Sequence, residues 1–350
     1  MFTCNAKDIE NMTKNVAQRV NPSLGISANG RMFVSYQTEN SVFAVYSDDD
    51  AMSWSAPCAM ASVKAGENVF DSRLWIDPQN RLWLMWSVIP SNRVECVICS
   101  DIDKDVLSWT DVRTLDFGLL LARPLVSTDG AWLFTTGVTD KEIAAREGAA
   151  GRNKGIYVFE TTDAGETFVL RGKPFADRNT FDSITATEKT IFSRPNGVDI
   201  VGKTFFVAYV QVSYGVAKFV SPDACRTFRP EADSTFGSYY SQFDAFTIGD
   251  HREKKFVIVN NMHFGEGGKM CLCAMTSNNR GDNYQGVLEL EGSDAKSFTP
   301  DIDVVGNTIY VVYSRENAQG VREIALARFT DEDVRAYSLV DESSYLGRLV

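Results

Sequence analysis

Several features that mark common functional classes are scarce or missing in this sequence. The 350 residues include only two histidines, and the seven cysteines form one CxxC pair without a second, so we expect no zinc site. There is no apolar run of about 18 residues that could cross a membrane. No phosphate-binding loop or nucleotide fingerprint occurs, and we therefore expect no cofactor.

The balance of charge is one-sided. Lys and Arg number 35 against 46 Asp and Glu, which gives a formal net charge of −11 at pH 7. This argues against nucleic-acid binding, which needs clustered basic residues. A small anionic ligand stays compatible with it, because a few arginines in a pocket act locally. The first residues lack the apolar segment of a secretory leader, so a cytoplasmic protein is expected.

What the sequence does contain is a unit that recurs six times. Each copy has a short apolar strand, a tight polar turn such as Asn29-Gly30, and a second strand rich in aromatic residues. The copies begin near residues 19, 70, 122, 193, 242 and 299, and each leaves room for two further strands. Four-stranded sheets repeated around an axis form a propeller. The sequence therefore predicts an all-β fold, a single six-bladed β-propeller of four-stranded antiparallel blades over residues 1–350. Only 8–18, 141–150 and 331–336 look helical.

A second motif follows the paired strands in several units. Its pattern is Ser/Thr-x-Asp-x-Gly-x-Thr/Ser-aromatic, and 161–168 is the best copy, with partial copies at 47–54, 221–228 and 277–284. The Asp accepts backbone N–H groups, the Gly permits a positive φ, and the aromatic residue anchors the loop between sheets. We therefore expect these residues to be structural and not catalytic.

These loops resemble the Asp boxes, or bacterial neuraminidase repeats, of the sialidase (neuraminidase) superfamily. The closing stretch 297–333 is similar to the last blade of such proteins. The resemblance implies a ligand pocket on the face where each innermost strand begins, joined by the loops after each second strand. At strand starts it selects Arg19, Asp71, Arg73, Arg123, Arg194, Asp244 and Asp301, and from the loops it selects Glu39, His263 and Arg315.

Arginine at so many strand starts is informative, because apolar residues would pack there at lower cost. Buried guanidinium groups need anionic partners, and their forked geometry suits carboxylates. Two interpretations stay open. In one, the arginines pair with aspartates across the axis as structural ion pairs. In the other, they bind the carboxylate of an acidic sugar such as a sialic or uronic acid.

The chain departs from the sialidase pattern at the catalytic positions. Arg194-Pro195 stands where the family has Glu-Pro, which removes the base of the tyrosine nucleophile. Gln211 and Lys269 fall where the family has its second and third arginines, and Phe298 falls near the nucleophilic tyrosine. Phe298 has no hydroxyl that could attack a substrate. The usual sialidase Tyr/Glu machinery is therefore not expected.

Two hypotheses remain. The first is a sialidase-like glycosidase or related enzyme on an acidic sugar, a lyase included, with substrate-binding residues at Arg19, Arg73, Arg123, Arg194, Asp244, Lys269 and Arg315. Glycoside cleavage needs paired acid and base groups, for which the candidates are Asp71, Asp301, Glu39 and His263. The second is a carbohydrate-binding propeller without catalysis. An insert at 139–154, rich in Ala and Gly, is either a lid over the pocket or an ordinary loop.

Overall fold

The computed structural model describes most of the chain beyond its first 19 residues. The described residues are 20–38, 40–89, 91, 93–115, 118–120, 122–127, 129–138, 155–172, 192–200, 203–212, 215–230, 243–248, 255–264, 269–278, 283–293, 296–316 and 319–350. Within this part, no helix is long and apolar enough to pass through a membrane.

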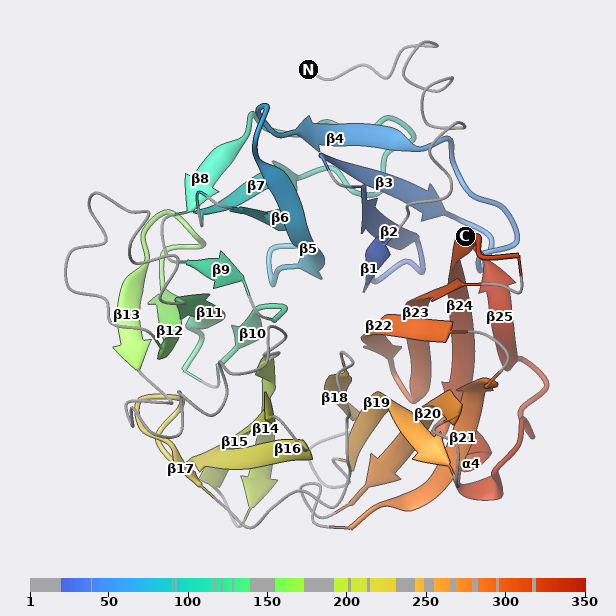
Figure 1. The fold of residues 1–350 in the computed structure, drawn as a ribbon. Helices are drawn as coiled ribbons and strands as arrows, with labels where there is room; N and C mark the ends of the chain where they lie inside the picture. Colours follow the sequence, from blue (N-terminus) through green and yellow to red (C-terminus); the bar gives the residue numbers. More distant parts are fainter. Residues whose placement is uncertain are drawn as a thin grey trace.

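The described residues form antiparallel sheets that stand around one axis (Figure 1). The first sheet contains β1 (Val20–Ile26), β2 (Met32–Gln37), β3 (Ser41–Ser47) and β4 (Cys58–Ser62). The second contains β5 (Asn68–Ile76), β6 (Leu82–Ile89), β7 (Arg93–Cys99) and β8 (Arg113–Leu115). The third contains β9 (Leu119–Leu120), β10 (Leu125–Val126), β11 (Trp132–Val138), β12 (Gly155–Thr161) and β13 (Val169–Gly172).

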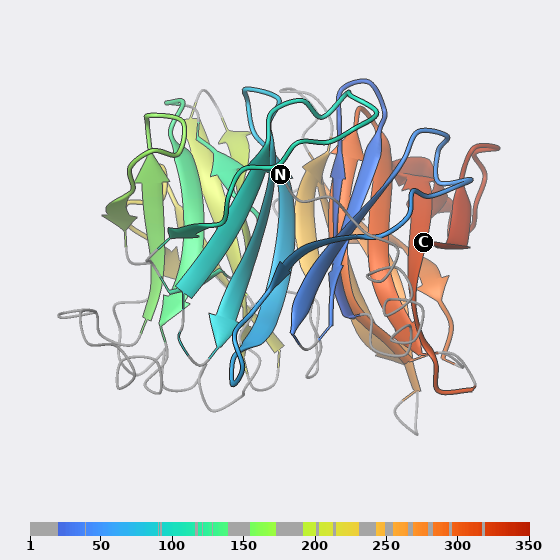
Figure 2. The same cartoon turned by 90° about the horizontal axis from the view of Figure 1, so that it is seen from above.

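The second half of the chain repeats the arrangement. The fourth sheet contains β14 (Phe192–Ile200), β15 (Lys203–Val212), β16 (Gly215–Ser221) and β17 (Arg229–Pro230). The fifth contains β18 (Asp244–Ile248), β19 (Lys255–Phe264), β20 (Lys269–Ser277) and β21 (Gln285–Glu291). The sixth contains β22 (Lys296–Val305), β23 (Thr308–Glu316), β24 (Arg322–Thr330) and β25 (Tyr345–Leu349). Figure 2 shows the strands running along the axis.

The all-β propeller of four-stranded antiparallel blades is confirmed for five of these sheets, whereas the sequence predicted six such blades. The exception is the third sheet, which has five strands because its innermost strand is interrupted. Both β9 and β10 pair with β11, at Thr136–Gly137 and at Trp132–Leu133 respectively. Ala122, Arg123 and Pro124 lie between the two pieces and belong to neither strand.

The helix predicted over 331–336 is confirmed as α4 (Asp331–Ala336). Thr330 caps its first turn: the Thr330 hydroxyl accepts from the backbone N–H of Asp333, and the Asp333 carboxylate accepts from the backbone N–H of Thr330. The segments 8–18 and 141–150, and the insert at 139–154, lie outside the described residues.

The hydrophobic core lies between neighbouring sheets. Trp75 and Trp83 of the second sheet pack against Trp132 and Phe134 of the third. The last sheet packs in the same way on the first, where Val312 belongs to one cluster with strands β1 to β3, which joins the two ends of the chain. Because apolar packing occurs between the sheets, the innermost strands are free to carry polar side chains at the axis.

Three of the predicted loop motifs share one set of hydrogen bonds. In the turn at 161–168, Asp163 accepts from the backbone N–H of Thr167 at 2.9 Å, and the Thr161 hydroxyl accepts from that of Gly165 at 3.0 Å. The turns at 47–54 and 221–228 repeat both bonds. Phe168 packs on Phe134 with 5.0 Å between ring centroids. In these turns the aspartate is occupied by the backbone, as expected for a structural role.

Candidate functional site

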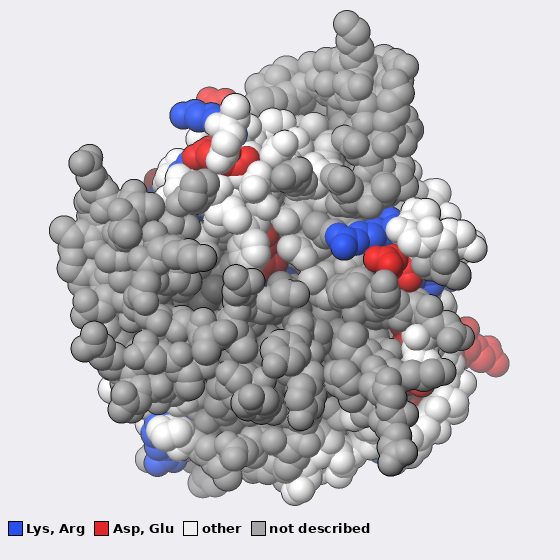
Figure 3. Space-filling view, in the orientation of Figure 1, with Lys and Arg blue, Asp and Glu red and all other residues white. Residues whose placement is uncertain are grey.

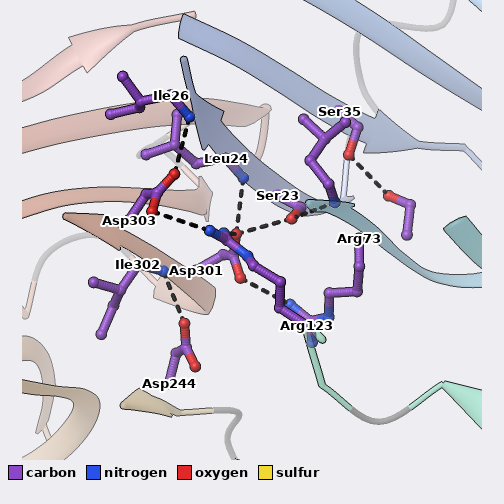
Figure 4. A network of polar contacts seen from close by, with 12 residues as sticks. Ser23, Leu24, Ile26, Ser35, Arg73, Arg123, Asp244, Asp301, Ile302 and Asp303 are labelled. Atoms are coloured by element: carbon purple, nitrogen blue, oxygen red, sulfur yellow. Dashed lines mark hydrogen bonds and ion pairs between the residues drawn. The ribbon is translucent and has the colours of Figure 1, made fainter. Parts of the chain in front are cut away.

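A cluster of charged side chains occupies the axis, where innermost strands of several sheets converge (Figure 4). Its carboxylates are Asp71, Asp244, Asp301 and Asp303, and its guanidinium groups are Arg73 and Arg123. Acidic atoms are visible deep at the centre of the face seen in Figure 3. Among the described residues of the cluster, carboxylates outnumber guanidinium groups by two.

A bulge at the start of the innermost strand shapes this cluster. In β1, β5, β14 and β22 the register against the second strand shifts by the same pattern near the strand start, for instance between Phe70 and Arg73. Residues in three of these bulges adopt left-handed backbone: Asn21 with φ 49°, Asp71 with φ 53° and Thr299 with φ 45°. A bulge redirects the side chains that follow it, and here those side chains meet at the axis.

Asp301 is the centre of the cluster. Its Oδ2 accepts from the hydroxyl of Ser23 and from the backbone N–H of Leu24, both at 2.8 Å, and from Arg123. Its Oδ1 lies 3.4 Å from Nη1 of Arg73. Only 1% of Asp301 is exposed. These contacts all come from donors of the fold, which makes the Asp301 carboxylate a structural hub.

Backbone N–H groups on the axial edge of the innermost strands are capped by the neighbouring sheet. Asp301 accepts from Leu24, Asp244 accepts from Ile302 at 2.8 Å, and the Ser23 hydroxyl accepts from Leu74 at 2.9 Å. Buried N–H groups without an acceptor are costly. The polar residues of the axis therefore have a structural role, because they connect each of these sheets to its neighbour by hydrogen bonds.

Asp71 differs from the other carboxyl groups. Its Oδ2 accepts from Nη2 of Arg73 at 2.9 Å, whereas its buried Oδ1 has no hydrogen-bond partner among the described residues. Burial raises the pKa of Asp71 above its ordinary value, against the lowering effect of Arg73. For Arg73, burial alone would lower the pKa, but the attraction of Asp71 and Asp301 raises it, so the guanidinium stays charged. Asp71 is thus a buried carboxyl with a raised pKa and one oxygen that has no partner among the described residues.

The structure brings five of the predicted site residues together: Asp71, Arg73, Arg123, Asp244 and Asp301. Arg315 is placed elsewhere: it pairs with Glu291 at 2.9 Å and with Glu323 at 3.1 Å, toward the outer strand β21. Glu39 and Arg19 lie outside the described residues, as do the side chains of Arg194, His263 and Lys269.

Two members of the cluster were missed by the sequence analysis. Asp303 accepts from the backbone N–H of Ile26 at 2.9 Å and lies 3.3 Å from Arg123, and Ser23 joins Asp301 to the second sheet. A signal for Asp303 existed, because residues two apart on a strand share a face and Asp301 had already been assigned to the axis. Ser23 carries no such signal, since it contacts Asp301 across 278 positions of sequence.

A tyrosine and a glutamate do meet in the described structure, between the fifth and sixth sheets. The Tyr313 hydroxyl donates to Glu291 at 3.0 Å. Tyr313 is fully buried, and burial together with Glu291 raises the pKa of its hydroxyl far above the ordinary value. A hydroxyl in that state does not ionise to attack a substrate, so the pair does not replace the nucleophile missing at Phe298. In the described part of the chain, no three or more His, Cys, Asp or Glu side chains are grouped to hold a metal ion.

No known family model matches the chain, and no curated protein matches its sequence. Solved structures do match its fold. The Hadza microbial sialidase Hz136 superposes with a TM-score of 0.69 at 12% identity, covering 91% of this chain and 66% of that protein. Trypanosoma rangeli sialidase in complex with sialic acid superposes with a TM-score of 0.60 at 13% identity, covering 89% of this chain and 54% of that one. The fold is sialidase-like.

A third match has no assigned activity. It is a protein of unknown function from Dyadobacter fermentans, with a TM-score of 0.64 at 13% identity, covering 89% of this chain and 94% of that one. The present chain therefore spans under two thirds of the length of the two sialidases but nearly all of this third protein. At such identities the likeness concerns the fold alone.

Proposed function

We propose that this chain is a sialidase-like carbohydrate-active enzyme that cleaves a glycosidic bond of a sialic or uronic acid at the axis of a six-bladed propeller. The six sheets would be its blades and residues 1–350 one domain. The observation that carries the proposal is the state of Asp71, which is buried and held by Arg73 through one oxygen, while its other oxygen has no partner in the described part of the chain.

Asp71 suits the role of general acid. Glycoside cleavage begins with a proton given to the oxygen of the leaving group, and the donor must still be protonated near neutral pH. A raised pKa moves a carboxyl toward that state, and burial raises the pKa of Asp71. Asp301 is a weaker candidate for the same role, because Ser23, Leu24 and the two arginines already occupy its oxygens.

Support for an acidic sugar comes from Arg73 and Arg123. Both guanidinium groups are buried at the axis, and the Nε atom of each has no hydrogen-bond partner within the described ranges. The longest of their contacts with Asp301 is that of Arg73, at 3.4 Å, so this bond is the easiest to exchange for a ligand carboxylate. The matching trypanosomal sialidase was solved with sialic acid bound.

A second candidate function, carbohydrate binding without catalysis, is favoured by one observation. Arg73 and Arg123 are both already paired with Asp301, as in a structural ion-pair network. Breaking such a buried pair is costly. A ligand that contacts Asp71 and leaves the pairs of Arg73 and Arg123 with Asp301 intact would be bound and not cleaved.

The test is a screen of sugar release from sialosides and uronic-acid oligosaccharides with the unchanged chain, Asp71→Asn and Asp77→Asn. Asp77 is an equally buried carboxylate of the second sheet, bonded to Trp83 and Arg81 at its hairpin end. Loss of a general acid should lower the rate about 10²- to 10⁴-fold in Asp71→Asn, with Asp77→Asn unaffected. Binding without release supports the second candidate. Neither release nor binding with any acidic glycan overturns both.

A further inference from the structure

Alternating charges connect Asp303, Arg123, Asp301 and Arg73 in one line (Figure 4). The line continues from Arg73 to Asp71. Oδ1 of Asp303 lies 3.3 Å from Nη1 of Arg123, whose Nη2 contacts Oδ2 of Asp301. The other oxygen of Asp301 lies 3.4 Å from Nη1 of Arg73, whose Nη2 contacts Asp71 at 2.9 Å. Each arginine therefore uses its two terminal nitrogens on two different carboxylates, and the line ends at Oδ2 of Asp71.

Asp303 is fixed independently of the rest of the line. Its Oδ2 accepts from the backbone N–H of Ile26 in the first sheet at 2.9 Å, and its Oδ1 accepts from that of Val304 at 3.0 Å. Backbone donors cannot turn away as a side chain can. The carboxylate is thus held rigidly between two sheets, and the position of Arg123 follows from it.

We propose that Asp303 is a positioning residue: it fixes the Arg123 guanidinium and so acts on Asp71 through the ion pairs between them. The proposal rests on the proposed role of Asp71 as the acid. Asp303 contacts Ile26, Val304 and Arg123, and its effect on Asp71 passes through Arg123.

The direction of the effect follows from how the charges are shared. Without the Asp303 charge, Arg123 has one ion-pair partner fewer and binds Asp301 more strongly. The contact of Asp301 with Arg73, which is already long at 3.4 Å, then weakens. Arg73 turns further to Asp71 and stabilises its ionised form, so the pKa of Asp71 falls. The charged groups that act on Asp71 from its surroundings are Arg73, Asp301 and Asp244.

The experiment measures the titration of Asp71 directly, by NMR of the full chain labelled with carboxyl-¹³C aspartate, with the Asp71 signal assigned from its loss in Asp71→Asn. In Asp303→Asn we expect the midpoint to move to lower pH by less than about 1 unit, since a direct neighbour shifts a carboxyl by about 1 to 3 units. Asp77→Asn should leave the midpoint in place.

Arg123→Lys provides a second variant with the opposite expectation. Lysine keeps the charge but cannot serve two carboxylates with a fork, so Asp301 turns to Arg73 and the midpoint of Asp71 should rise. A midpoint that stays in place in both variants, or moves in the same direction in both, overturns the proposal. If Asp303→Asn does not fold, Arg123→Lys alone decides, and an unmoved midpoint there overturns it.

This readout needs no enzymatic activity. If the chain cleaves no glycan but shows the two opposite shifts, the proposed function is refuted and the positioning role of Asp303 is supported. If the chain cleaves glycans but the midpoint of the Asp71 titration stays in place in both variants, the proposed function is supported and the positioning role of Asp303 is refuted. In an active chain, the basic limb of the pH–rate profile, where the general acid loses its proton, should follow the same shifts.

Discussion

Substitution of Asp301 should have the largest effect on stability of any single change at the axis. Asp301→Ala removes the acceptor of the Ser23 hydroxyl and of the Leu24 N–H, and it removes the shared counter-charge of Arg73 and Arg123. Loss of one partner from a buried ion pair costs about 3 to 5 kcal/mol, because the remaining charge is left buried. Unfolding entropy of about 2.1 cal/mol/K per residue over 350 residues converts this to a Tm lower by about 4 to 7 °C.

The assay is thermal and urea unfolding of the unchanged chain, Asp301→Ala and Asp101→Ala. Asp101 is the control because it forms an ion pair with Lys104 on the surface, where side-chain exposures are 51% and 66%. Such a pair is worth at most about 1 kcal/mol. If Asp301→Ala lost no more stability than Asp101→Ala, the charges at the axis would be hydrated and not a buried network. The structural interpretation of the arginines would then be refuted.

Two further predictions concern other parts of the fold. Burial alone would raise the pKa of Asp333, but hydrogen bonds, chiefly from the backbone N–H groups of Asp341 and Val340, lower it from 3.8 to about 2. The stabilisation of the fold by the Asp333 carboxylate is therefore complete above pH 4 and disappears as the pH falls through 2. Urea unfolding of Asp333→Asn should show a loss of about 2 kcal/mol at pH 7 that vanishes near pH 2, and a loss independent of pH would contradict this. Gly165 and Gly130 both have positive φ, but a Cβ at Gly165 would come within 2.5 Å of the Trp83 ring, while one at Gly130 meets nothing within 4 Å. Thermal unfolding should show Gly130→Ala costing about 1 to 2 kcal/mol for the backbone alone and Gly165→Ala about 1 to 3 kcal/mol more, and equal losses would refute the clash.

Sequence patterns located the strands and the shared turns because both are local. A hairpin residue or an Asp-x-Gly turn is encoded within a few positions, so the turn at 161–168 and the helix at 331–336 could be predicted correctly. The third sheet was predicted with four strands because the sequence pattern did not reveal the break between β9 and β10. Arg315 was predicted at the pocket because it lies at a strand end. Its side chain instead pairs with Glu291, a contact that depends on the neighbouring sheet.

The partners at the axis were beyond prediction for the same reason. That arginine and aspartate would meet there followed from their places at strand starts, but the pairing could not be read from the sequence. Asp301 contacts Arg73 across 228 positions and Arg123 across 178. Only the closed arrangement of sheets determines which carboxylate receives which guanidinium, and hence which oxygen stays open.

Backbone hydrogen bonding explains why arginine occurs at the axis where it does. After the bulge, each innermost strand presents an N–H that the preceding sheet must cap, as Asp301 does for Leu24 and Ser23 does for Leu74. Arginine has no acceptor and cannot perform this task. Arg73 nonetheless holds the capping position of the second sheet, and the residue that follows Arg123 in the third sheet is Pro124, which has no N–H to cap. The proline thus leaves Arg73 without a backbone group to cap, and Arg73 pairs with Asp71.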